Sequence, residues 1–153
     1  RFKYTSCFII DNHQIYDNSK VNAYQQMTML NHVTIGVTDL DRATQFYDEL
    51  LGVIGAKELW STPEMRMYGS SPELPKVAVC TPFNGQPQNP GNGNMIAFKG
   101  GSKERVDQLY AKAMKLGATD EGKPGERKHY NRYYAAYIRD LDGNKLCFIH
   151  AYS

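Results

Sequence analysis

The residues of this sequence that could do chemistry are a histidine, a methionine and a cysteine that fall on three separate predicted strands. His32 alternates with the apolar residues of the run 31–37, and Met95 and Cys147 alternate in the same way with those of two later runs. If the apolar residues of each run cover a helix, the three donors point to the opposite side, into a shared hollow. A hollow with facing donors is the usual geometry of a metal or small-molecule pocket.

The three donors suit some ions better than others. Imidazole and thiolate bind zinc, and sulfur ligands favour Cu(I), whereas harder ions such as Mg²⁺ and Mn²⁺ prefer carboxylate oxygens, which this set lacks. A structural explanation is also open for each residue. His32 could be a core histidine bonded to a backbone carbonyl, Met95 a flexible filler of the core, and Cys147 a small buried apolar group.

Two similar halves of the chain position these donors. In each half an alternating strand leads into an amphipathic helix that ends at a glycine, Gly52 in the first half and Gly117 in the second. His32 and Met95 lie 63 positions apart, and the two glycines lie 65 positions apart. A nearly constant offset indicates an internal duplication.

The rest of each half is predicted from alternation and from turn residues. Further strands are predicted over 57–61, 65–68, 76–80, 133–139 and 145–150. The stretch 119–130 contains Pro124 and Gly125 and is predicted to be a loop. Residues 89–94 are predicted to form a turn and not a phosphate-binding loop, because no Lys-Ser/Thr pair follows them and they lead into a strand.

The predicted fold class is α+β, with two tandem β-α-β-β-β modules that form a cup-shaped mixed sheet and with the helices packed outside. The first module covers about 30–84 and the second about 94–153. Residues 1–29 are interpreted as an N-terminal extension of unknown role.

Composition excludes several classes of protein. The chain has 153 residues, with 18 Lys and Arg against 16 Asp and Glu, so it lacks the basic excess of a nucleic-acid binder. No apolar run approaches the roughly 20 residues of a membrane span. Cys7, Cys80 and Cys147 are an odd number of cysteines without paired spacing, which predicts free thiols in a reducing, cytoplasmic compartment.

Aromatic residues could form the wall of the hollow. Tyrosine offers a flat stacking surface with a polar tip, which suits a planar or amphipathic ligand. The predicted pocket residues are Tyr130, Tyr133, Tyr134, Tyr137 and Arg139 from the second half, with Trp60 and Phe83 from the first. Alternatively, the tyrosines only pack against the helix or against a dimer interface.

Three segments of the sequence resemble a known superfamily. They are NHVTIGVTDLDRATQFYDELLG at 31–52, FNGQPQNPGNGNMIAF at 83–98 and YYAAYIRDLDGNKL at 133–146. Together they are similar to the vicinal oxygen chelate superfamily, which includes glyoxalase I, bleomycin-resistance proteins, extradiol dioxygenases and fosfomycin-resistance enzymes. The resemblance covers residues 30–152 and implies a homodimer. It does not imply one activity, because this fold carries many chemistries.

The resemblance also implies where a metal would be held. His32 matches the first ligand of the family, whereas Met95 stands where a histidine is usual and Cys147 where a glutamate is usual. We therefore expect a small-molecule-binding protein with a degenerate metal site and without a cofactor. The alternative is a metal-dependent lyase, isomerase or dioxygenase that uses His32 with non-standard ligands, so the question of enzymatic activity stays open. A third class is a purely structural role with an empty pocket.

Overall fold

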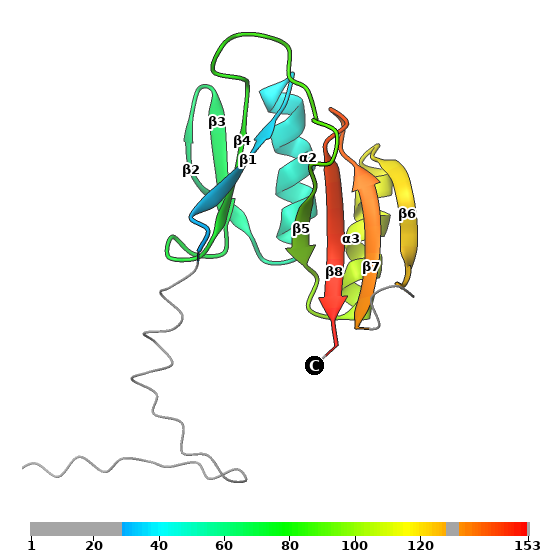
Figure 1. Cartoon of the computed structure of the whole chain (residues 1–153). Coiled ribbons are helices and arrows are strands. Elements are labelled where there is room, and N and C mark those ends of the chain that lie inside the picture. Colours follow the sequence, from blue (N-terminus) through cyan, green and yellow to red (C-terminus); the bar gives the residue numbers. More distant parts are fainter. Residues whose placement is uncertain (1–28, 128–131, 153) are drawn as a thin grey trace, which may run out of the picture.

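The computed structural model describes residues 29–127 and 132–152, which form two modules of similar construction (Figure 1). The first module contains β1 (His32–Gly36), α2 (Leu40–Gly52), β2 (Lys57–Thr62), β3 (Met65–Gly69) and β4 (Lys76–Cys80). The second contains β5 (Ile96–Lys99), α3 (Lys103–Lys115), β6 (Thr119–Glu126), β7 (Tyr133–Arg139) and β8 (Lys145–Ala151). The prediction of an α+β fold with two tandem β-α-β-β-β modules is confirmed.

Each module has its own four-stranded mixed sheet. The strand order is β1-β4-β3-β2 in the first sheet and β5-β8-β7-β6 in the second. In each sheet the first strand pairs in parallel with the last, and the other neighbours are antiparallel. The repeated order shows that the duplication seen in the sequence is a duplication of topology.

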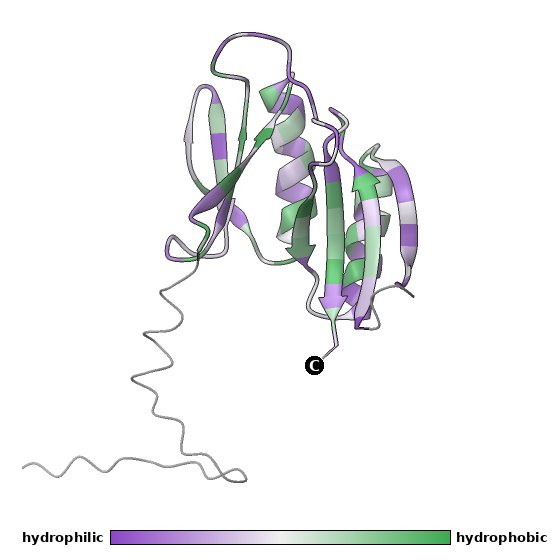
Figure 2. Cartoon of the chain, in the orientation of Figure 1, coloured by the Kyte–Doolittle hydropathy of each residue, from purple (hydrophilic) through white to green (hydrophobic). Residues whose placement is uncertain are grey.

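Each helix covers one face of its sheet, and both helices lie on the same side of the molecule (Figure 1). Asp39 caps α2 by accepting a hydrogen bond from the Arg42 amide, and Ser102 caps α3 by accepting one from the Arg105 amide. The apolar stripes of α2 and α3 join the helix-facing residues of both sheets in one buried cluster. In Figure 2, β8 is coloured hydrophobic over most of its length, whereas the edge strand β6 is mostly hydrophilic.

The prediction of a loop over 119–130 is wrong for most of that range, because β6 occupies residues 119–126. A proline inside a strand removes a backbone donor, which is tolerated at the edge of a sheet. β6 is such an edge strand, and its pairing with β7 shifts register around Gly122 and Gly125. Pro124 therefore marks an edge strand here and not the absence of one.

The two helices end at or just before their predicted glycines, but the two glycines differ in conformation. Gly52 is the last residue of α2, and the left-handed conformation comes three residues later, at Gly55, with φ of 76°. In the second module Gly117 itself has φ of 94°. Of these two glycines, only Gly117 therefore needs the conformational freedom that glycine provides.

A buried carboxylate joins the two modules. Asp140, 5% exposed, precedes the turn between β7 and β8, and its Oδ2 accepts a hydrogen bond of 2.5 Å from the hydroxyl of Tyr47 on α2. Asp142 in the same turn accepts bonds from the Thr38 amide and from Arg42. The segment RDLDGN in the second module thus anchors the first module through its side chains.

Candidate functional site

The face of each sheet that points away from the helices, called here the helix-free face, carries the predicted donors. Ile35 is buried against α2, so His32 and Thr34 point to the opposite side of the first sheet. In the second sheet Phe98 and Phe148 belong to the core. Cys147, the neighbour of Phe148 along β8, therefore lies on the helix-free face.

The imidazole of His32 is exposed at the start of β1. Its Nδ1 lies 2.8 Å from the side-chain oxygen of Asn31, and no other hydrogen bond to a described residue is recorded for its ring. The alternative of a satisfied core histidine is therefore wrong.

The thiol of Cys147 lies at the centre of the second helix-free face. It is 2% exposed and pairs in register with Ala97 on one side and with Tyr137 on the other. Burial raises the pKa of the Cys147 thiol to about 11, against the opposing effects of Arg127, Lys145 and Tyr137. Cys147 is therefore a neutral thiol at pH 7.

The predicted aromatic wall is only partly assembled on these faces. Trp60 pairs with Met67 on the helix-free face of the first sheet and is 49% exposed. Tyr133, Tyr137 and Arg139 share the helix-free face of the second sheet, because they alternate with buried residues of β7.

Two predicted wall residues lie elsewhere, and a third falls outside the described residues. The hydroxyl of Tyr134 donates a hydrogen bond of 2.9 Å to Asp107 on α3, so this side chain is on the helix side and its assignment to the pocket is corrected. Phe83 is fully exposed in the segment between the modules and packs against neither face. Tyr130 falls in 128–131, outside the described residues.

One residue that the sequence did not single out completes this face. Arg127 follows β6, and its Cζ lies 4.6 Å from the centroid of the Tyr137 ring. Its Nη2 donates to the backbone carbonyls of Gly122, Lys123 and Ala135. Residue 127 belongs to the charged run 123–128, which was interpreted as a solvated loop, although the family resemblance implies that this loop borders the mouth of the pocket.

A cavity of about 260 Å³ lies where the two modules meet. Residues of both modules line the cavity, among them Thr34, Gly36, Asn94, Met95, Asn144 and Lys145. Asn144 ties its two sides together, since its Nδ2 donates 2.9 Å bonds to the Gly36 carbonyl and to Asp140. Of the three predicted donors, Met95 lines this cavity, and His32 and Cys147 do not.

The segment 89–94 contributes to this cavity. It forms turns, as predicted, with glycines of positive φ at 91 and 93. Asn89, Pro90 and Asn94 nevertheless line the space between the modules. The sequence could have indicated this role, because the segment links the two repeats and such a link has to pass the junction between them.

The comparisons with known proteins agree with this geometry. The family model described as glyoxalase/bleomycin resistance protein/dioxygenase superfamily matches residues 29–148. The chain belongs to the glyoxalase/bleomycin resistance protein/dioxygenase superfamily. No curated protein matches the chain.

Solved structures of this superfamily resemble the chain over nearly all of the described residues. A glyoxalase/bleomycin resistance protein from Albidiferax ferrireducens T118 is 38% identical, with a TM-score of 0.74, and the match covers 80% of this chain and 99% of that one. A glyoxalase/bleomycin resistance protein/dioxygenase family enzyme from Burkholderia phytofirmans PsJN is 22% identical, with a TM-score of 0.64 and coverage of 79% and 97%. A glyoxalase I mutant from Zea mays is 22% identical, with a TM-score of 0.63, and covers 81% of this chain and 46% of that one. The last two show the fold alone.

The superfamily resemblance implies metal ligands at His32, Met95 and Cys147, and these residues do not fit a hard divalent ion. Cys147 keeps its proton at neutral pH, and the Met95 thioether is a poor ligand for such ions. Among the described residues no three His, Cys, Asp or Glu side chains gather where they could hold one ion. The degenerate metal site stays a prediction.

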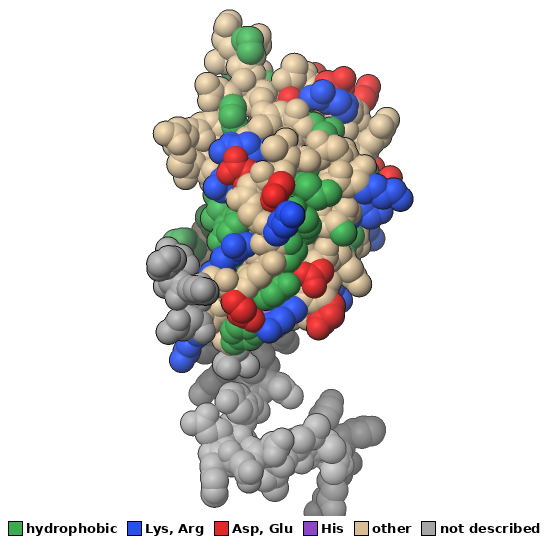
Figure 3. Space-filling view, turned by 90° about the vertical axis from the view of Figure 1, so that its right-hand side faces the viewer, with side chains coloured by type: hydrophobic (Ala, Val, Ile, Leu, Met, Phe, Trp, Pro, Cys, Tyr) green, Lys and Arg blue, Asp and Glu red, His purple; other side chains and the backbone are tan. Residues whose placement is uncertain are grey.

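The outer surface of this superfamily member carries mixed charge. Figure 3 shows the β6 side, where basic and acidic side chains are interleaved without a patch of one sign. None of the helices in the described ranges is long and apolar enough to cross a membrane.

Proposed function

We propose that this protein binds a small planar or amphipathic molecule between its two modules, without a catalytic divalent metal. The cavity at the junction of the modules carries the proposal. It is lined by β1 and by the segment that leads into β5. β1 and β5 are the first strands of the two modules. Its wall combines apolar groups such as Met95 with the amides of Asn94 and Asn144, which suits a ligand of mixed polarity.

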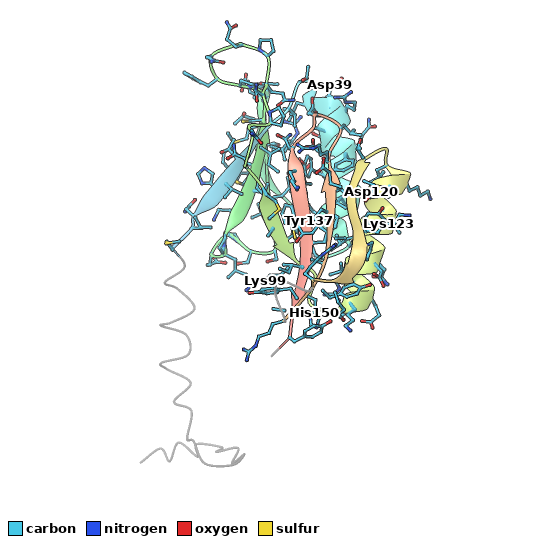
Figure 4. All side chains as sticks on the ribbon, turned by 45° about the vertical axis from the view of Figure 1, so that its right-hand side comes forward. Asp39, Lys99, Asp120, Lys123, Tyr137 and His150 are labelled. Carbon is cyan, nitrogen blue, oxygen red and sulfur yellow. The ribbon has the colours of Figure 1, made fainter. Side chains whose placement is uncertain are left out.

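Aromatic side chains on the helix-free faces support the same function. Tyr137 presents its ring in the middle of the second sheet (Figure 4), and Lys145, which lines the cavity, lies 5.6 Å from the centroid of that ring. A ligand that extends from the cavity past Lys145 would meet a flat surface on which to stack. Trp60 offers a second such surface on the first sheet.

Binding without metal chemistry follows from the donors. A thioether at Met95 replaces the imidazole that the family resemblance implies, and a neutral thiol at Cys147 replaces the carboxylate, so this donor set lacks the carboxylate that would act as a general base. We also propose that the protein works as a homodimer in the cytoplasm.

The cavity can be tested with a neutral planar probe, N-phenyl-1-naphthylamine, whose fluorescence rises in an apolar site. We expect saturable binding, weakened at least tenfold by Thr34→Trp, because the indole would fill the cavity. Thr119→Trp makes the same change on the exposed edge strand β6 and should leave binding unchanged. Absence of saturable binding to the unmodified protein, or equal loss in both variants, would refute the proposal.

The metal question needs its own measurement. Protein purified without chelator should contain less than a tenth of an equivalent of Fe, Ni, Mn or Zn by elemental analysis. One equivalent of any of these ions, lost on His32→Ala, would instead support the metal-dependent enzyme.

A further inference from the structure

Basic side chains gather on the helix-free face of the second sheet. Lys145 and Arg139 are register partners on β8 and β7, and Lys99 extends from β5 on the same side, since its neighbour Phe98 is in the core. Arg127 joins them from the end of β6. Four cations therefore share one face of a small sheet.

One carboxylate faces these cations among the described residues. Glu121 accepts bonds from Arg139 at 2.6 Å and from Lys145 at 3.2 Å. Arg127 donates only to backbone carbonyls, and no ion pair or hydrogen bond to a described residue is recorded for Lys99. The face thus keeps a positive excess although the chain as a whole carries 18 basic and 16 acidic residues.

The cations surround the aromatic ring and the buried thiol. Arg127 lies 4.6 Å and Lys145 lies 5.6 Å from the Tyr137 ring centroid. The same two cations oppose the upward shift that burial imposes on the pKa of Cys147. The potential at the middle of this face is therefore positive, and the burial of Cys147 leaves it weakly screened by solvent.

Arg127 also has an unused donor. Its Nε is buried and has no hydrogen-bond partner among the described residues. A buried donor without an acceptor is unfavourable, and a guanidinium is suited to binding an anion through more than one N–H. An acceptor supplied by a ligand would remove this penalty.

Lys145 connects this face to the cavity, because it lines the cavity and also lies over Tyr137. In Figure 4, Tyr137 lies in the middle of the second sheet and Lys99 at the lower end. A molecule seated in the cavity can therefore contact Lys145 from the side opposite to the Tyr137 ring or beside it.

The geometry points to a ligand that is an organic acid, an inference that rests on the proposed function. Its planar or apolar part occupies the cavity beside Met95, and its anionic group, a carboxylate or a group of similar charge, is held by Lys145 in the positive potential to which Lys99 and Arg127 add. Lys145 is then the residue that selects acids over neutral molecules of the same shape.

Two fluorescent probes that differ by one acidic group test this assignment. 8-Anilino-1-naphthalenesulfonate is N-phenyl-1-naphthylamine with a sulfonate added. We expect the sulfonate probe to bind at least tenfold more tightly than the neutral one at 50 mM NaCl, and 500 mM NaCl to remove most of that preference. The preference for the sulfonate probe over the neutral one, taken as the ratio of their affinities, should fall about tenfold on Lys145→Gln, whatever the variant does to the neutral probe alone.

Matched variants separate a local effect from a change in overall charge. Lys99→Gln should weaken the sulfonate probe in the same direction, whereas Lys115→Gln, on the exposed end of α3, should not. Thermal unfolding of each variant confirms that it is folded. Equal affinity for the two probes, or equal effects of Lys145→Gln and Lys115→Gln, would overturn the assignment while the proposed binding function stands. If neither probe binds the unmodified protein, the proposed function itself falls.

Discussion

Replacing Tyr47 by Phe removes the hydrogen bond that links the first helix to the second module. The hydroxyl of Tyr47, a residue 1% exposed, donates over 2.5 Å to Asp140, a residue 5% exposed. Burial and the neighbouring Asp140 raise the pKa of Tyr47 well above its usual range, so the phenol is a donor at pH 7. The substitution deletes one oxygen and leaves the packing of the ring in place.

The expected loss in the free energy of unfolding is about 2 kcal/mol. Hydrogen bonds to charged groups contribute roughly 1.5–3 kcal/mol. A buried carboxylate left without any donor would lose more, but Asp140 still accepts from the amides of Asp142 and Asn144 and from the Asn144 side chain. For a chain of this size, about 2 kcal/mol corresponds to a fall in Tm of about 4–8 °C.

Urea unfolding at pH 7, followed by far-ultraviolet circular dichroism, measures this loss. Tyr134→Phe is the matched control, because it deletes the same hydroxyl from an exposed 2.9 Å bond to Asp107. We expect it to lower stability by less than about 0.5 kcal/mol, since water replaces an exposed partner. If the Tyr47 variant loses no more than the Tyr134 variant, the buried bond does not hold the modules together and the reasoning is refuted.

Two further predictions concern the buried thiol and the glycines that end the helices. The unfolded Cys147 thiol loses its proton from about pH 8.5, whereas the folded thiol keeps it to about pH 11, so between these values the unmodified protein should lose about 2–3 kcal/mol more stability than Cys147→Ala loses. Urea unfolding at pH 7.5, 9 and 10.5 checks the difference, and parallel curves for the two proteins would contradict it. Gly117→Ala should destabilise by about 1 kcal/mol or more, because φ is 94°, while Gly52→Ala should be neutral or stabilising, because it is helical and nothing lies within 4 Å of the added carbon. Equal thermal shifts for the two variants would show that this conformational argument is wrong.

The repeating pattern of the sequence was sufficient to predict the fold. Alternation and helical spacing are properties of neighbouring residues, so they indicate which face of each strand is apolar. The pattern indicates which residues of β1, β5 and β8 face the helices. It also indicates that His32 and Cys147 lie on the helix-free faces of their sheets. The nearly constant offset between the halves predicted that each module repeats the same order of elements.

Other parts of the candidate site depended on contacts between distant residues. Pro124 is compatible with a strand only because that strand lies at the edge of its sheet, and the local sequence pattern does not show which strands are edge strands. Tyr134 was one of several similar tyrosines, and only the position of Asp107 on α3 shows that it faces the helix. The role of Arg127 depends on the carbonyls that β6 and β7 present to it.

The sequence by itself therefore determined the two modules, their amphipathic helices and the side of each strand on which the donors lie. Only the tertiary structure decided that the modules are joined through Tyr47 and Asp140, that the segment 89–94 lines a cavity, and that Lys145 connects this cavity to a basic face. The physical reason is range. Alternation acts between residues a few positions apart, whereas hydrogen bonds and charges join whichever groups the packed chain brings together, here 93 positions apart for Tyr47 and Asp140.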